Sequence, residues 1–103
     1  MAAELVWMPQ ALADVRDIYV QIGLAQPRAA ERFFDSFERK ARLLIDQPRM
    51  GVRRPDIRSS VRIVVETPFP MLYETVPDTD DGAVEIIRVV RVLDGRRDLR
   101  AFS

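Results

Sequence analysis

The side chains with the clearest chemical potential in this sequence are arginines. Fifteen of the 16 basic residues are arginine, whose planar guanidinium binds carboxylates and phosphates through paired hydrogen bonds. A group of them lies near the C-terminus: Arg88 and Arg91 interrupt an apolar run, and Arg96, Arg97 and Arg100 follow it. An arginine-rich end of this kind can bind an anionic partner, or can stabilise negative charge that develops in a reaction.

Opposite charges are separated along the chain, although the formal net charge is zero. The segment 49–62 carries five arginines and the single acid Asp56, whereas the segment 74–85 carries five acids and no base. The basic segment is either a phosphate-binding surface or a solvated loop. Positive stretches of this kind also suit an acidic partner segment.

The residue types that are missing exclude many reactions. The chain has no histidine and no cysteine, so it lacks an imidazole base, an imidazole ligand and a thiolate metal site. We therefore expect no cofactor and no metal. RNA cleavage by the 2′-hydroxyl requires a base, an acid and a cation. The candidate bases are Glu66, Glu74 and Asp94, and the candidate acid is Tyr73. Because the sequence does not show that these groups converge, we favour a binding function over catalysis.

The arginine-rich end must be positioned by the preceding stretch, Gly82–Asp98. Aliphatic residues fill both alternating registers of this stretch, which predicts an interior β-strand covered on both sides. The two registers are Ile86 and Val90 on one face, and Ile87, Val89 and Leu93 on the other. Arg88 and Arg91 are three residues apart, so we expect them to point to opposite faces. Each needs a partner if it is buried. For Arg91 and Arg97 a structural role, paired with Asp98, Asp94 or Glu66, is the alternative to a binding role.

The N-terminal half predicts a helical hairpin. Apolar residues recur at helical spacing from Pro9 to Ile22 and again from Pro27 to Asp46, and Gly23 marks the end of the first helix. A short apolar run, Glu4–Trp7, precedes the hairpin and is expected to form a first strand. The aromatic stripe of the second helix, Phe33, Phe34 and Phe37, is expected to lie in the core, and a groove for a partner is the alternative.

The C-terminal half predicts an antiparallel sheet. Strands are expected at Val61–Glu66 and Met71–Val76, separated by Thr67–Pro70, with the Gly82–Asp98 stretch as the last strand. The whole chain, 1–103, is then one α+β domain in the order β-α-α-β-β-β, with the helical hairpin on one face of a small antiparallel sheet. No stretch resembles a signal peptide or a membrane span, so we expect a cytoplasmic protein.

The ordered set of motifs resembles the ParE branch of the ParE/RelE toxins, the toxin halves of bacterial type II toxin–antitoxin modules. The resemblance covers nearly the whole chain. It rests on Val6-Trp7-Met8-Pro9-Gln10-Ala11, Asp17-Ile18-Tyr19, Ala29-Ala30, Gln47-Pro48-Arg49-Met50-Gly51, Val61-Arg62, Leu72-Tyr73, Arg88-Val89-Val90-Arg91-Val92-Leu93 and Arg96-Arg97-Asp98.

The resemblance implies a toxin that poisons DNA gyrase by binding. The chain departs from the nucleolytic members of the superfamily, because it has Asp94 where histidine is common and Phe102 where a tyrosine or histidine is typical. It also lacks their arginine shortly before Tyr73. These departures argue against RNA cleavage. A ribosome-dependent mRNA endonuclease and an inactive, antitoxin-binding homologue remain the alternatives.

All three alternatives imply a ParD-like antitoxin as partner. We expect it to dock on apolar surface beside the hairpin and sheet, at Phe33, Phe37, Met71 and Leu72. The surface that contacts the gyrase target is expected at Arg91, Arg96, Arg97 and Arg100. Neither a membrane nor direct nucleic-acid binding by the toxin alone is expected.

Overall fold

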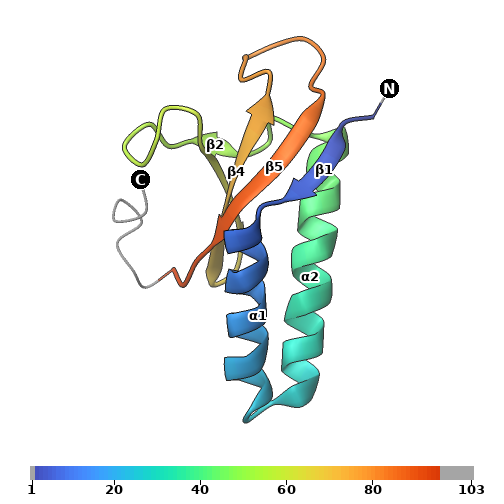
Figure 1. The fold of residues 1–103 in the computed structure, drawn as a ribbon, viewed down its shortest axis with the longest axis vertical. Coiled ribbons are helices and arrows are strands. Elements are labelled where there is room, and N and C mark those ends of the chain that lie inside the picture. The colour runs from blue at the N-terminus through green and yellow to red at the C-terminus, as the bar shows by residue number, and fades with distance from the viewer. Residues whose placement is uncertain (1, 96–103) are drawn as a thin grey trace.

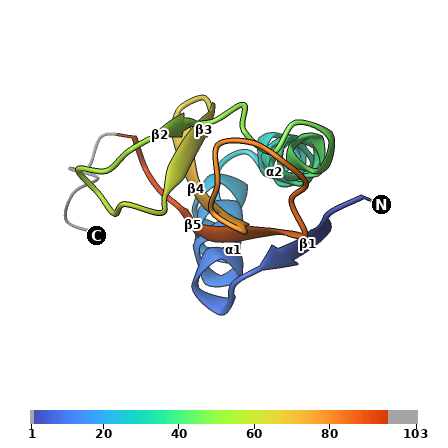
Figure 2. The same cartoon turned by 90° about the horizontal axis from the view of Figure 1, so that it is seen from above.

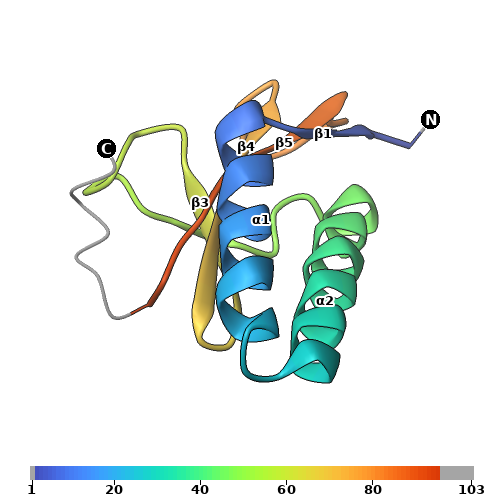
Figure 3. The same ribbon diagram turned by 60° about the horizontal axis from the view of Figure 1, so that its bottom comes forward.

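The structure, a computed structural model, describes residues 2–95. These residues form two helices and five strands, and the two helices lie side by side on one face of the sheet (Figures 1 and 3). In chain order the elements are β1 (Glu4–Trp7), α1 (Pro9–Gly23), α2 (Pro27–Asp46), β2 (Val52–Arg53), β3 (Arg62–Glu66), β4 (Phe69–Val76) and β5 (Ile86–Val92). The predicted α+β class is confirmed, and β2 is a short strand that the sequence did not reveal.

Both helices begin at a proline and end close to the predicted residues. α1 starts at Pro9 and α2 at Pro27, where the missing backbone N–H of proline is not needed for helical hydrogen bonding. Phe37 of α2 is buried, and its ring meets that of Phe69 edge-on, with the centroids 5.6 Å apart. Phe33 makes a similar contact with Phe69 at 5.2 Å. Phe33 and Phe37 therefore pack α2 onto the start of β4, as expected, whereas Phe34, the third phenylalanine of the stripe, is 51% exposed and lies outside the core.

The strand order in the sheet is β1-β5-β4-β3-β2 (Figure 2). β3, β4 and β5 form the predicted antiparallel meander. β1, in contrast, pairs with β5 in parallel, from Glu4 opposite Ile86 to Trp7 opposite Val89. The sheet is therefore mixed, and β5 is an interior strand between β1 and β4, as its composition predicted.

Pro70 lies inside β4, so the prediction that Thr67–Pro70 separates two strands is wrong in its extent. β4 begins at Phe69, and Pro70 pairs with Val65 of β3. Proline lacks a backbone donor, but its carbonyl still accepts, and the Pro70 oxygen takes the Leu93 N–H at 2.9 Å. Only Thr67 and Pro68 form the turn.

A β-bulge interrupts the alternation of β5. Leu72 of β4 pairs with Arg91 while the next residue, Tyr73, pairs with Val89, so Val90 is the extra residue. The bulge shifts the registers, and Leu93 joins a separate cluster instead of sharing a face with Ile87 and Val89. The predicted registers are therefore wrong beyond Val89, and the strict alternation on which the opposite faces of Arg88 and Arg91 depended does not hold.

The two clusters occupy the two faces of the sheet. The main core lies under the helices and includes Phe37, Tyr73 and Val89. On the other face, Leu72 and Leu93 pack with Ile57 from the connection between β2 and β3. Within the described residues, neither helix has the length and hydropathy that a membrane span requires.

Candidate functional site

Arg91 is held by a carboxylate of the first helix. Its Nε donates to Asp14 Oδ2 at 2.7 Å and its Nη2 donates to Oδ1 at 3.0 Å. The same Oδ2 accepts the backbone N–H of Val92 at 3.0 Å. Asp14 is 9% exposed, so its bidentate contact with Arg91 is largely shielded from water.

The position of Asp14 explains why this contact forms. β1 pairs with β5 only as far as Val89, so the edge of β5 beyond that point has no neighbouring strand. α1 continues from β1 past this edge and places Asp14 against Val92. The structural role considered for Arg91 is thus observed, with Asp14 as a partner that was not among the three acids expected from the sequence.

A polar groove of about 170 Å³ lies between α1 and the end of β5. Asp17, Ile18 and Gln21 of α1 form one wall, while Arg91 and Asp94 belong to the opposite side. The other arginines proposed for target contact, Arg96, Arg97 and Arg100, lie outside the described residues. Their role stays a prediction, and Arg91 is the member of that set that the structure places.

Three of the four residues expected to contact the antitoxin have almost no accessible surface. Phe37, Met71 and Leu72 are each 1% exposed, the first two in the main core and Leu72 in the second cluster. Phe33 is half-buried. The predicted docking at these residues stays untested. In this conformation a partner can contact only the exposed side chains beside the three buried residues.

An apolar groove beside these residues provides such a surface. It has a volume of about 110 Å³ and lies between α1 and α2 near the end of β1. Leu12 and Phe34 at the groove are 54% and 51% exposed. Phe33 and Phe34 are neighbours in α2, so their side chains point in directions about 100° apart, and this spacing is the sequence signal that could have identified Phe34. The complete lining is Trp7, Leu12, Val15, Phe34, Phe37 and Glu38.

Tyr73, the candidate proton donor, is fully buried, and its hydroxyl group already takes part in two hydrogen bonds. Its hydroxyl donates to the Pro48 carbonyl at 2.9 Å and accepts the Gly51 N–H at 2.9 Å. Burial raises the pKa of Tyr73, while the Gly51 hydrogen bond and the charge of Arg62 partly oppose that rise. The hydroxyl holds the chain after α2 in place and is not presented to a ligand.

Glu74 is a candidate base whose carboxylate contacts two arginines. Its carboxylate lies 3.7 Å from Arg58 Nη1 and 3.4 Å from Arg88 Nε, and it accepts a hydrogen bond from Ser60. Arg88 therefore has the carboxylate partner that its position required. Because neighbouring strand residues point to opposite faces, the Tyr73 hydroxyl is turned away from this cluster. Glu66, the other candidate base on the sheet, pairs with Lys40 at 3.5 Å.

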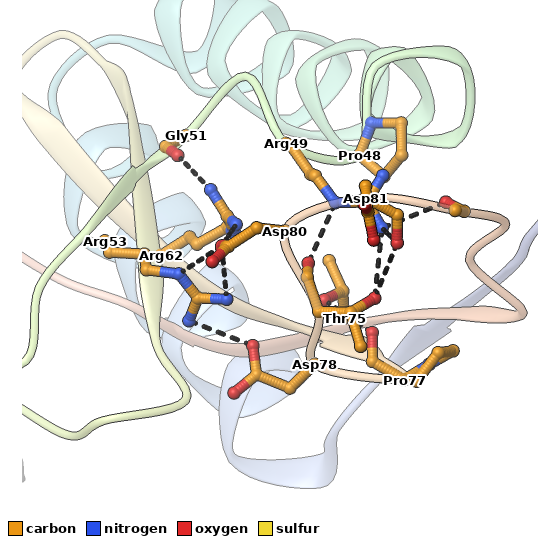
Figure 4. A network of polar contacts seen from close by, with 12 residues as sticks. Pro48, Arg49, Gly51, Arg53, Arg62, Thr75, Pro77, Asp78, Asp80 and Asp81 are labelled. Carbon is orange, nitrogen blue, oxygen red and sulfur yellow. Dashed lines mark hydrogen bonds and ion pairs between the residues drawn. The ribbon is translucent and has the colours of Figure 1, made fainter.

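The basic segment after α2 binds the acidic β4–β5 connection of the same chain (Figure 4). Arg49 donates to three main-chain carbonyls, those of Thr79, Asp81 and Gly82, at 2.8–2.9 Å. Arg53 contacts Asp78 at 3.0 Å and Asp80 at 3.0 Å. The sequence presented these segments as separate charge blocks, and the structure brings them together.

The sequence matches the family described as "ParE toxin of type II toxin-antitoxin system, parDE" over residues 5–99. A solved structure titled "Chromosomal ParDE TA system from P. aeruginosa" has a similar fold, with a TM-score of 0.70 and 22% sequence identity. The similarity covers 89% of this chain and 95% of that one. A comparison with curated proteins gives no match. The mixed sheet, the helical hairpin and the family match lead to one conclusion: the chain belongs to the ParE toxin family of type II toxin–antitoxin systems.

Proposed function

We propose that this ParE-family toxin acts in the cytoplasm by binding DNA gyrase, without making or breaking a bond itself, and that a ParD-like antitoxin neutralises it. The family match over residues 5–99 carries the proposal, together with the implication of the resemblance that such toxins trap gyrase. The arginine-rich end that follows β5 is the proposed contact surface for the target, with Arg96, Arg97 and Arg100 as its main cations.

The arrangement of the polar groups supports binding over cleavage. Among the described residues, the cluster at Glu74 combines a carboxylate with Arg58 and Arg88. A cleavage reaction also needs a proton donor for the leaving group, and Tyr73 is buried with its hydroxyl in two hydrogen bonds. The same cluster is nevertheless the observation that favours a ribosome-dependent endonuclease as the second candidate.

The purified toxin should be tested with gyrase in DNA supercoiling and DNA cleavage assays, with and without the antitoxin encoded beside it. We expect inhibition of supercoiling, accumulation of cleaved DNA, and relief of both by the antitoxin. If ribosome-bound mRNA is cut while supercoiling is unaffected, the endonuclease is the correct function. If neither occurs and expression without the antitoxin does not slow growth, the chain is an inactive homologue.

We also propose that the antitoxin docks in the apolar groove between α1 and α2. The exposed side chains of Leu12 and Phe34 supply the apolar contact area that an amphipathic helix requires. Co-purification of the toxin with the product of the adjacent reading frame tests the partnership, and the absence of a stable complex would contradict it.

A further inference from the structure

The contacts of Arg62 are incomplete. This residue is 7% exposed, and its Nη1 donates to the Gly51 carbonyl at 3.1 Å. Its Nη2 reaches Asp80 Oδ1 only at 3.4 Å, and its buried Nε has no hydrogen-bond partner among the described residues. The edge formed by Nε and Nη2 is the one that receives a carboxylate with two parallel bonds, and it is underused here.

A single oxygen serves two arginines at this point. Asp80 Oδ1 accepts from Arg53 Nε and lies within 3.0 Å of Arg53 Nη2, besides its long contact with Arg62 (Figure 4). The Asp80 side chain is 84% exposed, so water competes with the ion pairs and weakens them. The Asp80 carboxylate is thus weakly bound, and it leaves part of the hydrogen-bonding capacity of the two guanidinium groups unused.

We propose that Arg53 and Arg62 form a binding site for an acidic peptide segment of a partner protein, and that Asp78 and Asp80 of the β4–β5 connection occupy this site as intramolecular competitors. The partner's carboxylate replaces Asp80 and fills the Nε–Nη2 edge of Arg62. Because Arg49 holds the connection through carbonyls, the loss of the two aspartate contacts does not require the whole connection to detach.

The present occupant identifies the class of ligand. It is a stretch of peptide in a bent connection, and its carboxylates contact Arg53 and Arg62. The inference goes beyond the proposed function, since it requires neither gyrase nor a particular antitoxin; where the antitoxin has an acidic segment, that segment is a ligand of the required chemistry.

The test measures binding of a fluorescent peptide that repeats Asp-Thr-Asp-Asp to the full chain and to the double variant Asp78→Asn/Asp80→Asn. Removal of the three ion pairs that Asp78 and Asp80 make with Arg53 and Arg62 should raise the affinity for the peptide about threefold to tenfold. A peptide with asparagine in place of every aspartate should not bind. Adding Arg53→Gln to the double variant should abolish the gain, with circular dichroism used to check that each variant is folded.

The matched control is Asp35→Asn/Asp46→Asn, which removes two exposed acids of α2 and changes the net charge equally. An equal gain in this control would show that only net charge matters and would overturn the site. An unchanged affinity in Asp78→Asn/Asp80→Asn would also overturn it. A single-stranded oligonucleotide that binds the double variant more tightly than the acidic peptide would replace the peptide with a nucleic acid as the ligand. Since no arm contains gyrase or antitoxin, these outcomes are independent of the proposed function.

Discussion

At the scale of single residues, Asp14 supplies the hydrogen-bond acceptor that a neighbouring strand would otherwise provide at the end of β5. It accepts the Val92 N–H where β1 no longer reaches, and it binds Arg91 with both of its oxygens. Removing one partner of a shielded pair leaves the other charge without compensation, which costs more than the pair itself contributes. Arg91 therefore helps to hold the end of β5 against α1.

We expect Asp14→Ala to lower the free energy of unfolding by about 2–3 kcal/mol, because it leaves both the Arg91 guanidinium and the Val92 N–H without this acceptor. Urea denaturation measures the change. Asp17→Ala on the same helix, where the side chain is exposed, should stay within about 0.5 kcal/mol of the wild type. The double variant Asp14→Ala/Arg91→Ala should be less destabilised than the sum of the single variants; strict additivity would show that the two residues do not act together.

Tyr73 is the second residue whose chemistry is structural. Tyr73→Phe keeps the ring but leaves the Pro48 carbonyl and the Gly51 N–H without their partner, and should cost about 1–3 kcal/mol. Burial raises the pKa of Tyr73 above its ordinary 10.0, so the protonated hydroxyl stabilises the fold below about pH 10, and this stability is lost as the pH rises through the raised pKa. The stability difference between the wild type and Tyr73→Phe should therefore shrink in alkaline solution, as urea titrations from pH 8 upward will show.

Tyr19 also affects the response of the protein to alkaline pH. It is 36% exposed and donates a hydrogen bond to Glu31. That hydrogen bond raises the pKa of Tyr19 as well, so the alkaline response should be measured in a Tyr19→Phe background. If the loss of stability caused by Tyr73→Phe in this background is the same at every pH, the Tyr73 hydroxyl does not titrate with unfolding.

At the scale of elements, the turn after α2 depends on close contact with β4. A Cβ added at Gly51 would lie 2.5 Å from the Tyr73 ring and 2.9 Å from the Ile63 carbonyl. Real Cβ atoms do not approach so closely, and the obstacle includes rigid backbone. The path of the chain from α2 into the basic segment is therefore fixed by the absence of a side chain at this position.

Gly51→Ala should consequently destabilise the fold by about 2 kcal/mol or more, because the turn must move and the Tyr73 hydrogen bonds with it. The control is Gly23→Ala in α1, where the new Cβ would make an ordinary 3.6 Å contact with Ala30. Alanine favours the helix at that position by up to about 1 kcal/mol. Thermal unfolding of the two variants should show shifts of opposite sign, and equal stability of both would contradict the importance of the Gly51 contact.

Local patterns predicted the elements well, because the helical periodicity of α1 and α2 and the prolines at their starts act over short distances. What the sequence did not reveal depends on contacts between distant segments. The parallel pairing of β1 with β5 and the contact of Asp14 with Arg91 each join residues more than 70 positions apart. The bulge at Val90 shifts the register of β5 by one residue. For the same reason, the sequence did not show that three of the four residues expected at the antitoxin surface are buried, or that Phe34 beside the half-buried Phe33 is exposed.

At the scale of the whole molecule, the two flanks of α1 carry different surfaces. Leu12 and Val15 contribute to the apolar groove toward α2, whereas Asp14, Ile18 and Gln21 contribute to the polar groove toward the end of β5. These sets lie on different sides of one helix, following its 3.6-residue period. An antitoxin in the apolar groove therefore need not cover the side of α1 that adjoins the arginine-rich end, and the two binding activities should be separable by mutation.

We expect Leu12→Ser/Phe34→Ser to weaken antitoxin binding at least tenfold, because both side chains expose apolar surface that docking would bury. Gyrase inhibition by this variant should be unchanged. Arg96→Ala/Arg97→Ala should show the reverse: a loss of gyrase inhibition with normal antitoxin affinity. Val20→Ser/Leu24→Ser is the matched control, since these residues are 54% and 85% exposed but do not line the groove. If either test variant impaired both activities while remaining folded, target and antitoxin would share one surface, and neutralisation would be direct competition for the arginine-rich end.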